Sequence, residues 1–166
     1  MFLNGYFRNA YRAFAALILA CVCFAATAQA DPLPLVRDLE AVAKIARAQH
    51  APVFVAFTLK RCPYCNTARR DYWAPMNSDH AWRGKVVMVE LVMDATPELH
   101  DFEGKPTTAR DFARRFGIRS APTVIVFDAN GTPATPPLVG LSSGDFYGAY
   151  LERAIEAGVT KMRAAR

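Results

Sequence analysis

The sequence predicts an α/β fold in which a mixed central sheet of about four strands is flanked by helices. Two nearly continuous apolar, β-rich runs lie at 52–58 and 86–93, which is typical of strands buried on both faces. Segments with apolar residues three and four positions apart precede, separate and follow these runs, as in amphipathic helices. A third such strand at 123–127 is followed by an Asn-Gly hairpin signal. Together these features predict one sheet with helices on both faces.

Residues 1–30 are expected to be a secretory signal peptide. They carry Arg8 and Arg12 and no acidic residue, then an apolar run over 13–26, and then Ala28-Gln29-Ala30 as a small-x-small cleavage site. The apolar run is shorter than the about 20 residues that a membrane-spanning helix needs. We therefore expect cleavage after Ala30 and export to the periplasm.

A lipid anchor is the alternative at this end of the chain. Ile18-Leu19-Ala20-Cys21 resembles a lipobox and would leave a lipidated Cys21 as the mature N-terminus. In either case the remaining chain, 31–166 under the first prediction, is long enough for one domain and too short for two. The formal net charge is +5, but the sequence has no run of basic residues interleaved with aromatic residues, which nucleic-acid binding would favour. No nucleic-acid partner is therefore expected.

The first half of the exported chain reads as helix, strand, helix, strand. Apolar spacing predicts a helix over 31–50, and the run at 52–58 predicts the first strand. A second helix is expected from Pro63 to about Tyr72, closed by Pro75. The second strand follows, and 94–107 reads as a long loop or short helical turn.

The second half reads as helix, strand, strand, helix. Thr108 begins a capping box for a helix that ends at Gly117. After the third strand, 137–141 is expected to pair back as an edge strand. Residues 142–145 are expected to cap a final helix that runs to about Ala157. Its predicted buried face is Phe146, Tyr150, Leu151 and Ile155.

Only Cys62 and Cys65 remain after the predicted cleavage, because Cys21 and Cys23 lie in the apolar run of the signal. One close pair indicates chemistry rather than a framework of structural disulfides, and so small a loop constrains the unfolded chain little. A zinc site would need four ligands, and the chain left after cleavage has no second cysteine pair to supply them. We therefore expect no metal and no cofactor.

The position of Cys62 predicts a redox nucleophile. It lies where a strand ends and a helix begins, so the helix dipole and the preceding Lys60 and Arg61 should lower the pKa of its thiol below the free value of about 8.5. Pro63 suits the first helical position. Cys65, three residues later, is placed to resolve a mixed disulfide formed at Cys62.

The chain resembles the thioredoxin superfamily, and specifically its small exported members, over about residues 50–158. The resemblance rests on an ordered set of motifs: Cys62-Pro63-Tyr64-Cys65 after a strand, Phe116-Gly117-Ile118-Arg119-Ser120-Ala121-Pro122-Thr123, the next strand with Asp128-Ala129-Asn130-Gly131, and Val139-Gly140.

This resemblance implies a thioredoxin fold in which Pro122 is a cis-proline facing the cysteines. The backbone beside it, at Ala121 and Thr123, would pair with an extended substrate peptide. Gly140 either allows a close backbone approach beside the site or is a turn glycine. The predicted catalytic residues are Cys62, Cys65, Pro122 and Glu90; the predicted substrate-binding residues are Pro63, Tyr64, Ala121, Thr123 and Gly140.

Two features depart from the family. Cytosolic-type thioredoxins have a buried aspartate where this chain has Ala56, so we expect Glu90, the only charge in its apolar strand, to accept the proton of Cys65. Otherwise Glu90 is an exposed edge residue or an ion-pair partner. The second departure is extra chain around 73–84 and 94–107, a short insertion between the active-site helix and the cis-proline strand. Four aromatic residues there either edge a partner groove or, as we favour, pack the insertion onto the core: Tyr72, Trp73, Trp82 and Phe102.

These features predict a monomeric periplasmic thiol–disulfide oxidoreductase. We favour reduction of disulfides in exported proteins, with electrons from a membrane-embedded thiol donor, because the helical insertion and dimerisation region of the exported oxidants and isomerases are missing. The Pro-Tyr pair between the cysteines occurs in both reductants and oxidants, so the direction stays open. The alternative is a thioredoxin-fold binding or assembly module with a regulatory or idle cysteine pair.

Overall fold

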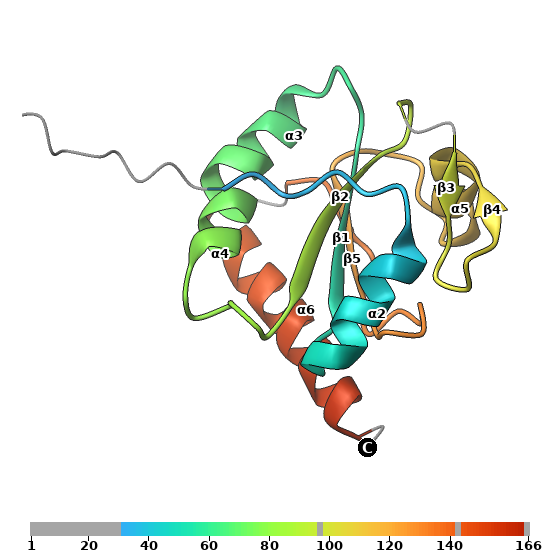
Figure 1. Cartoon of the computed structure of the whole chain (residues 1–166). Helices are drawn as coiled ribbons and strands as arrows, with labels where there is room; N and C mark the ends of the chain where they lie inside the picture. The colour runs from blue at the N-terminus through green and yellow to red at the C-terminus, as the bar shows by residue number, and fades with distance from the viewer. Residues whose placement is uncertain (1–30, 96–97, 142–143, 165–166) are drawn as a thin grey trace, which may run out of the picture.

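A computed structural model describes residues 31–95, 98–141 and 144–164, so the predicted signal peptide and the lipobox alternative lie outside the described residues. Its main sheet has the strand order β2-β1-β5-β6. The strands are β1 (Val53–Thr58), β2 (Val87–Val92), β5 (Thr123–Phe127) and β6 (Leu138–Val139). β1 pairs in parallel with β2 and antiparallel with β5 (Figure 1), and β6 is antiparallel to β5. The predicted mixed sheet is confirmed.

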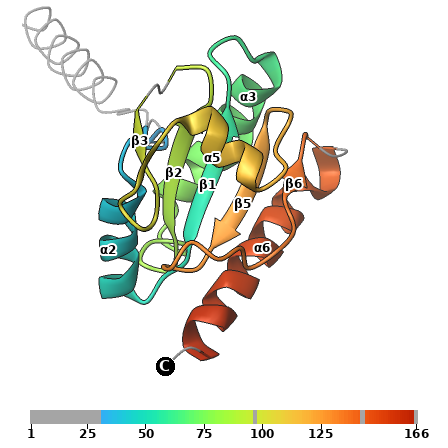
Figure 2. The ribbon, with the colours of Figure 1, turned by 90° about the vertical axis from the view of Figure 1, so that its right-hand side faces the viewer.

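Helices cover both faces of this sheet. α2 (Leu39–Gln49) and α5 (Ala109–Arg115) lie on one face, and α3 (Pro63–Ala68) and α6 (Gly144–Ala164) lie on the other (Figure 2). Alternate side chains of β1 point to opposite faces. Its odd-numbered residues pack with α2 and α5, and its even-numbered apolar residues pack with α3 and α6. This explains why the whole strand is apolar.

The first helix begins later than predicted. The helix expected over 31–50 starts only at Leu39, where the Asp38 side chain accepts a hydrogen bond from a backbone N–H of the first turn at 2.9 Å. The preceding segment is extended instead. Val36 N–H donates to the carbonyl of Glu90 at 2.9 Å, so this segment covers the outer edge of β2.

The helix that carries the cysteines does not stop before Pro75. A π-helical turn, η1 (Arg69–Trp73), follows α3 and leads into α4 (Ala74–Ser78). In a regular α-helix Pro75 would clash with the carbonyl four residues earlier. The π turn relieves this, since Ala74 N–H bonds to the carbonyl of Arg69 five residues back. The predicted boundary near Tyr72 is therefore wrong.

The region expected as a loop or helical turn at 94–107 forms a two-stranded hairpin where the structure describes it. Its strands are β3 (Leu99–His100) and β4 (Pro106–Thr107). Asp101, buried in the turn, accepts hydrogen bonds from Arg115 of α5 at 2.6 Å and from two backbone N–H groups. Burial alone raises the pKa of this carboxyl, but these hydrogen bonds outweigh it and hold the pKa below its usual range. The hairpin is thereby fastened to α5.

The last helix is longer than predicted and presents a different face. α6 extends to Ala164 rather than to about Ala157, and its predicted capping side chains lie outside the described residues. Phe146 and Tyr150 are exposed, whereas Tyr147 is buried beside Leu151 and Ile155. No helix among the described residues is long and apolar enough to cross a membrane.

Candidate active site

Cys62 and Cys65 form a disulfide at the start of α3, with their Cα atoms 5.2 Å apart. Cys62 is the residue before the first helical turn, and its Sγ accepts a hydrogen bond from the backbone N–H of Cys65 at 3.1 Å. Pro63 takes the first helical position, where its missing N–H is not needed. The predicted strand-to-helix position of the pair is confirmed.

The two cysteines differ in accessibility. Cys62 is 8% exposed, while Cys65 is fully buried. Tyr64, which lies between them in the sequence, is 70% exposed. The free N–H groups of the helix start, together with the exposed Lys60 and Arg61, favour negative charge at Cys62. Cys62 is thus the more exposed of the two cysteines.

Pro122 lies at the same end of the sheet as the disulfide, and its peptide bond with Ala121 is cis, as predicted. In the register of β1 and β5, Thr123 lies opposite Phe57. Pro122, the residue just before Thr123, therefore lies at the end of the sheet where β1 leads into the cysteine loop. The carbonyl of Pro122 accepts a hydrogen bond from Gly140 N–H at 2.8 Å. The structure therefore brings three predicted substrate-binding positions together: Ala121, Thr123 and Gly140.

The backbone of Gly140 fits the turn interpretation. Its φ is +74°, in the left-handed region that favours glycine, and a Cβ built there would meet no atom within 4 Å. A close approach by the described backbone therefore does not explain this glycine. Its contact with substrate remains a prediction.

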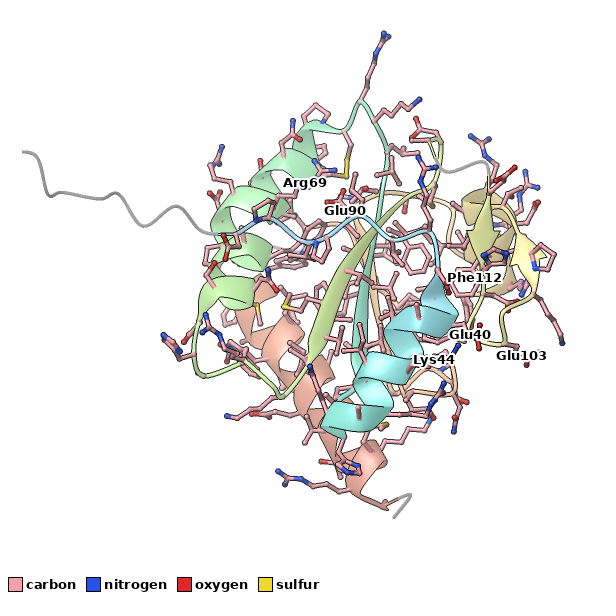
Figure 3. The ribbon with its side chains drawn as sticks, viewed as in Figure 1. Glu40, Lys44, Arg69, Glu90, Glu103 and Phe112 are labelled. Atoms are coloured by element: carbon pink, nitrogen blue, oxygen red, sulfur yellow. A yellow bond between two sulfur atoms is a disulfide. The ribbon has the colours of Figure 1, made fainter. Side chains whose placement is uncertain are left out.

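Glu90 lies in a buried charged cluster. Its side chain is 5% exposed and forms an ion pair with Arg69, whose Nε lies 2.9 Å from Oε2. Thr58 of β1 donates its hydroxyl to Oε1 at 2.6 Å. Figure 3 shows the Arg69 and Glu90 side chains pointing toward one another between the active-site helix and β2. Glu90 is therefore an ion-pair partner and not an exposed edge residue.

Glu90 lies opposite the position of the departure at Ala56. In the register of β1 and β2, Ala56 lies opposite Glu90, so the chain has a carboxylate on the strand next to the one where thioredoxins carry theirs. Arg69 comes one helical turn after Cys65 and begins the π turn. The sequence interpretation missed Arg69 and Thr58, although a lone charge in a buried strand calls for a cation nearby.

The aromatic residues of the insertion pack against the core, as favoured from the sequence. Trp73 is fully buried and donates its Nε1–H to the hydroxyl of Tyr147 at 3.3 Å. Burial raises the pKa of Tyr147 to about 12, so this hydroxyl stays protonated at neutral pH. Phe102 is buried on the opposite face of the sheet, among residues of α2 and α5. Tyr72 and Trp82 are partly buried on the same face as Trp73.

The described residues contain no group of three or more His, Cys, Asp or Glu side chains that could hold a metal ion. A cysteine pair at a helix start, one sulfur accessible and one buried, beside a cis-proline, defines a thiol–disulfide oxidoreductase site.

The chain belongs to the family of thioredoxin-like domains, whose model matches residues 39–155. Two solved thioredoxins share its fold. A poplar thioredoxin h is 13% identical, with 74% of this chain and 96% of that chain covered and a TM-score of 0.54. A thioredoxin of Malassezia sympodialis is 17% identical, with 80% and 98% covered and a TM-score of 0.53. No curated protein gave a significant match.

Proposed function

We propose that this protein reduces disulfide bonds in exported proteins. The observation that carries the proposal is the arrangement of the cysteine pair, with Cys62, 8% exposed, capping the start of α3 and Cys65 fully buried in its first turn. The Cys62 thiolate attacks one sulfur of a substrate disulfide, and the other substrate sulfur leaves as a thiolate. Cys65 then attacks Sγ of Cys62, releases the reduced substrate, and forms the Cys62–Cys65 disulfide.

The substrate is an extended polypeptide that lies along the cis-proline segment. The backbone at Ala121, just before β5, pairs with it by strand addition. Thr123, also expected to pair with substrate, is instead paired within the sheet with Phe57 and Val139. Exposed apolar side chains flank this path, with Val139 61% exposed next to Gly140 and Tyr64 70% exposed next to Cys62. This surface supports binding of a protein chain rather than a small molecule.

The proposed compartment is the periplasm, with the protein acting as a monomer. This part rests on the charge and apolar pattern of residues 1–30, with a lipid anchor at Cys21 as the alternative. Each turnover leaves the protein oxidised, so two electrons must return to the Cys62–Cys65 disulfide. A membrane-embedded thiol donor supplies them in this proposal.

Activity and redox potential test this proposal. The wild-type protein is expected to reduce insulin disulfides with dithiothreitol as donor, and Cys62→Ser is expected to be inactive. Equilibration with glutathione should give a reducing potential nearer the about −270 mV of thioredoxin than the about −120 mV of strong oxidants. An oxidising potential would reverse the assigned direction, and an inactive wild type would favour the binding module.

Glu90 is proposed as the proton acceptor for Cys65. Support comes from its place under the active-site helix and from Arg69, which links its carboxylate to the turn after Cys65. Glu90→Gln is expected to slow release of the substrate from the mixed disulfide and to move its pH profile upward, measured by stopped-flow fluorescence. Asp94→Asn, a change of another carboxylate near the cysteine loop, is the control and should leave the profile in place. An unchanged profile in Glu90→Gln would remove Glu90 from this role.

A further inference from the structure

A groove of about 590 Å³ opens beside the proposed active site, and its charged residues have no role in the chemistry described above. We call it the arginine groove. Its lining comes from α5, from the turn between α5 and β5, and from the ends of β1 and β2. The lining residues that matter for binding are Leu59, Met93, Ile118, Arg110, Arg114 and Arg119.

Two lining residues of the groove are close in sequence to the cysteine pair and the cis-proline. Leu59 is three residues before Cys62, and Arg119 is three residues before Pro122. A polypeptide held by Pro122 while its disulfide is attacked at Cys62 therefore has part of its chain within reach of this groove. The position of the groove suits recognition of the residues that flank a substrate disulfide.

The charges of the groove are mostly unpaired. Arg114 bonds to Asp111 at 3.0 Å, whereas Arg110 and Arg119 make no ion pair with any residue that the structure describes. One other carboxylate, Asp94, lies next to Met93 and accepts the backbone N–H of Lys60 at 2.9 Å. The cationic side chains of Lys60 and Arg61 continue the positive surface toward Cys62. The surroundings of the groove thus carry an excess of positive charge.

The floor of the groove is apolar. Leu59 and Met93 are partly buried, and Ile118 is 6% exposed. Arginine binds carboxylates through two parallel hydrogen bonds. A groove with guanidinium groups and an apolar floor therefore suits glutamate and aspartate, whose carboxylates would bind the arginines while their CH₂ groups contact the floor. Complementary charge of this kind raises the association rate and selects among partners.

We propose that the arginine groove binds an acidic segment next to the disulfide of the protein substrate. This inference rests on the proposed function and narrows its substrate class to disulfides flanked by glutamate or aspartate. The occupant lies in the groove during attack at Cys62, with its carboxylates on Arg110 and Arg119. The groove takes no part in electron transfer.

The test compares two synthetic peptide disulfides that differ only in three residues flanking one cysteine, Glu in one and Gln in the other. We expect the wild-type protein to reduce the Glu peptide with about five- to tenfold higher kcat/KM at low salt, and to lose this preference in high salt. The double variant Arg110→Gln/Arg119→Gln should reduce both peptides at the wild-type rate for the Gln peptide.

The control is Arg83→Gln/Arg163→Gln, which removes the same charge from exposed positions outside the groove and should keep the preference. Equal rates for both peptides in the wild type, or an equal loss of preference in the control, would overturn the proposal. Glutathione disulfide is tested as a small substrate beside the two peptides. If Arg110→Gln/Arg119→Gln slowed only the reduction of glutathione disulfide, the groove would bind a small molecule, and the proposal would be overturned. Failure to reduce either peptide would instead count against the proposed function.

Discussion

Cys65→Ser is expected to hold the protein covalently on its substrates. Cys62 is the accessible sulfur and Cys65 is fully buried, so the first attack does not need Cys65. Without a resolving thiol the mixed disulfide at Cys62 has no internal route to release. When the reduced variant is mixed with insulin in the absence of dithiothreitol, release of reduced insulin chains should fall by at least about 10³-fold, and a substrate adduct should appear on non-reducing gels and by mass spectrometry.

Cys62→Ser is the matched control for this experiment. It keeps the helix start and the cis-proline but lacks the attacking sulfur, so no adduct should form. Capture by Cys62→Ser without capture by Cys65→Ser would show that the roles of the two cysteines are reversed. Addition of dithiothreitol should release the adduct of Cys65→Ser.

Glu90→Ala is expected to lower the free energy of unfolding by about 3 kcal/mol, because it removes the buried partner of Arg69. It also leaves the Thr58 hydroxyl without its acceptor. The double variant Arg69→Met/Glu90→Leu should recover most of the loss, since it removes both charges and restores apolar packing. Urea unfolding at pH 7 measures each value.

Arg70→Met is the control for the charge change. Arg70 follows Arg69 in the chain, but it pairs with Asp71 at the exposed surface. Its loss should leave the urea midpoint unchanged, because exposed ion pairs contribute little. If Arg69→Met were as harmless as Arg70→Met, the pair with Glu90 would not stabilise the fold. If the double variant were no more stable than Glu90→Ala, the loss would come from something other than an uncompensated charge.

The strands of the main sheet and the cysteine pair could be predicted because their signals are local. β5 was expected at 123–127 and is found there, since a continuous β-branched run suits burial on both faces of the sheet. Cys62 lies at the start of α3 as expected, because a strand followed by Cys-Pro allows few other local conformations. The cis peptide before Pro122 followed from the resemblance of its flanking motif to thioredoxins.

The errors arose where distant contacts override local spacing. Apolar spacing extended the first helix back to Asp31, but the chain before Asp38 gains hydrogen bonds by lying along β2. The face predicted for the last helix included Phe146, yet Tyr147 faces the core, where Trp73 donates to its hydroxyl. The pairing of the first segment with β2 and the hydrogen bond between Trp73 and Tyr147 both join residues far apart in the sequence, so neither can be predicted from local apolar spacing.

A central strand that leads into a Cys-Pro-Tyr-Cys helix could be inferred from the amino-acid sequence, because strand burial, helix capping and cysteine spacing are properties of chain neighbours. The contact of Glu90 with Arg69, 21 residues away, and the groove that Leu59 and Arg119 line together are visible only in the folded chain. Such contacts depend on how helices and strands pack in three dimensions. A buried charge needs a partner, and the packing determines which residue lies close enough to be that partner.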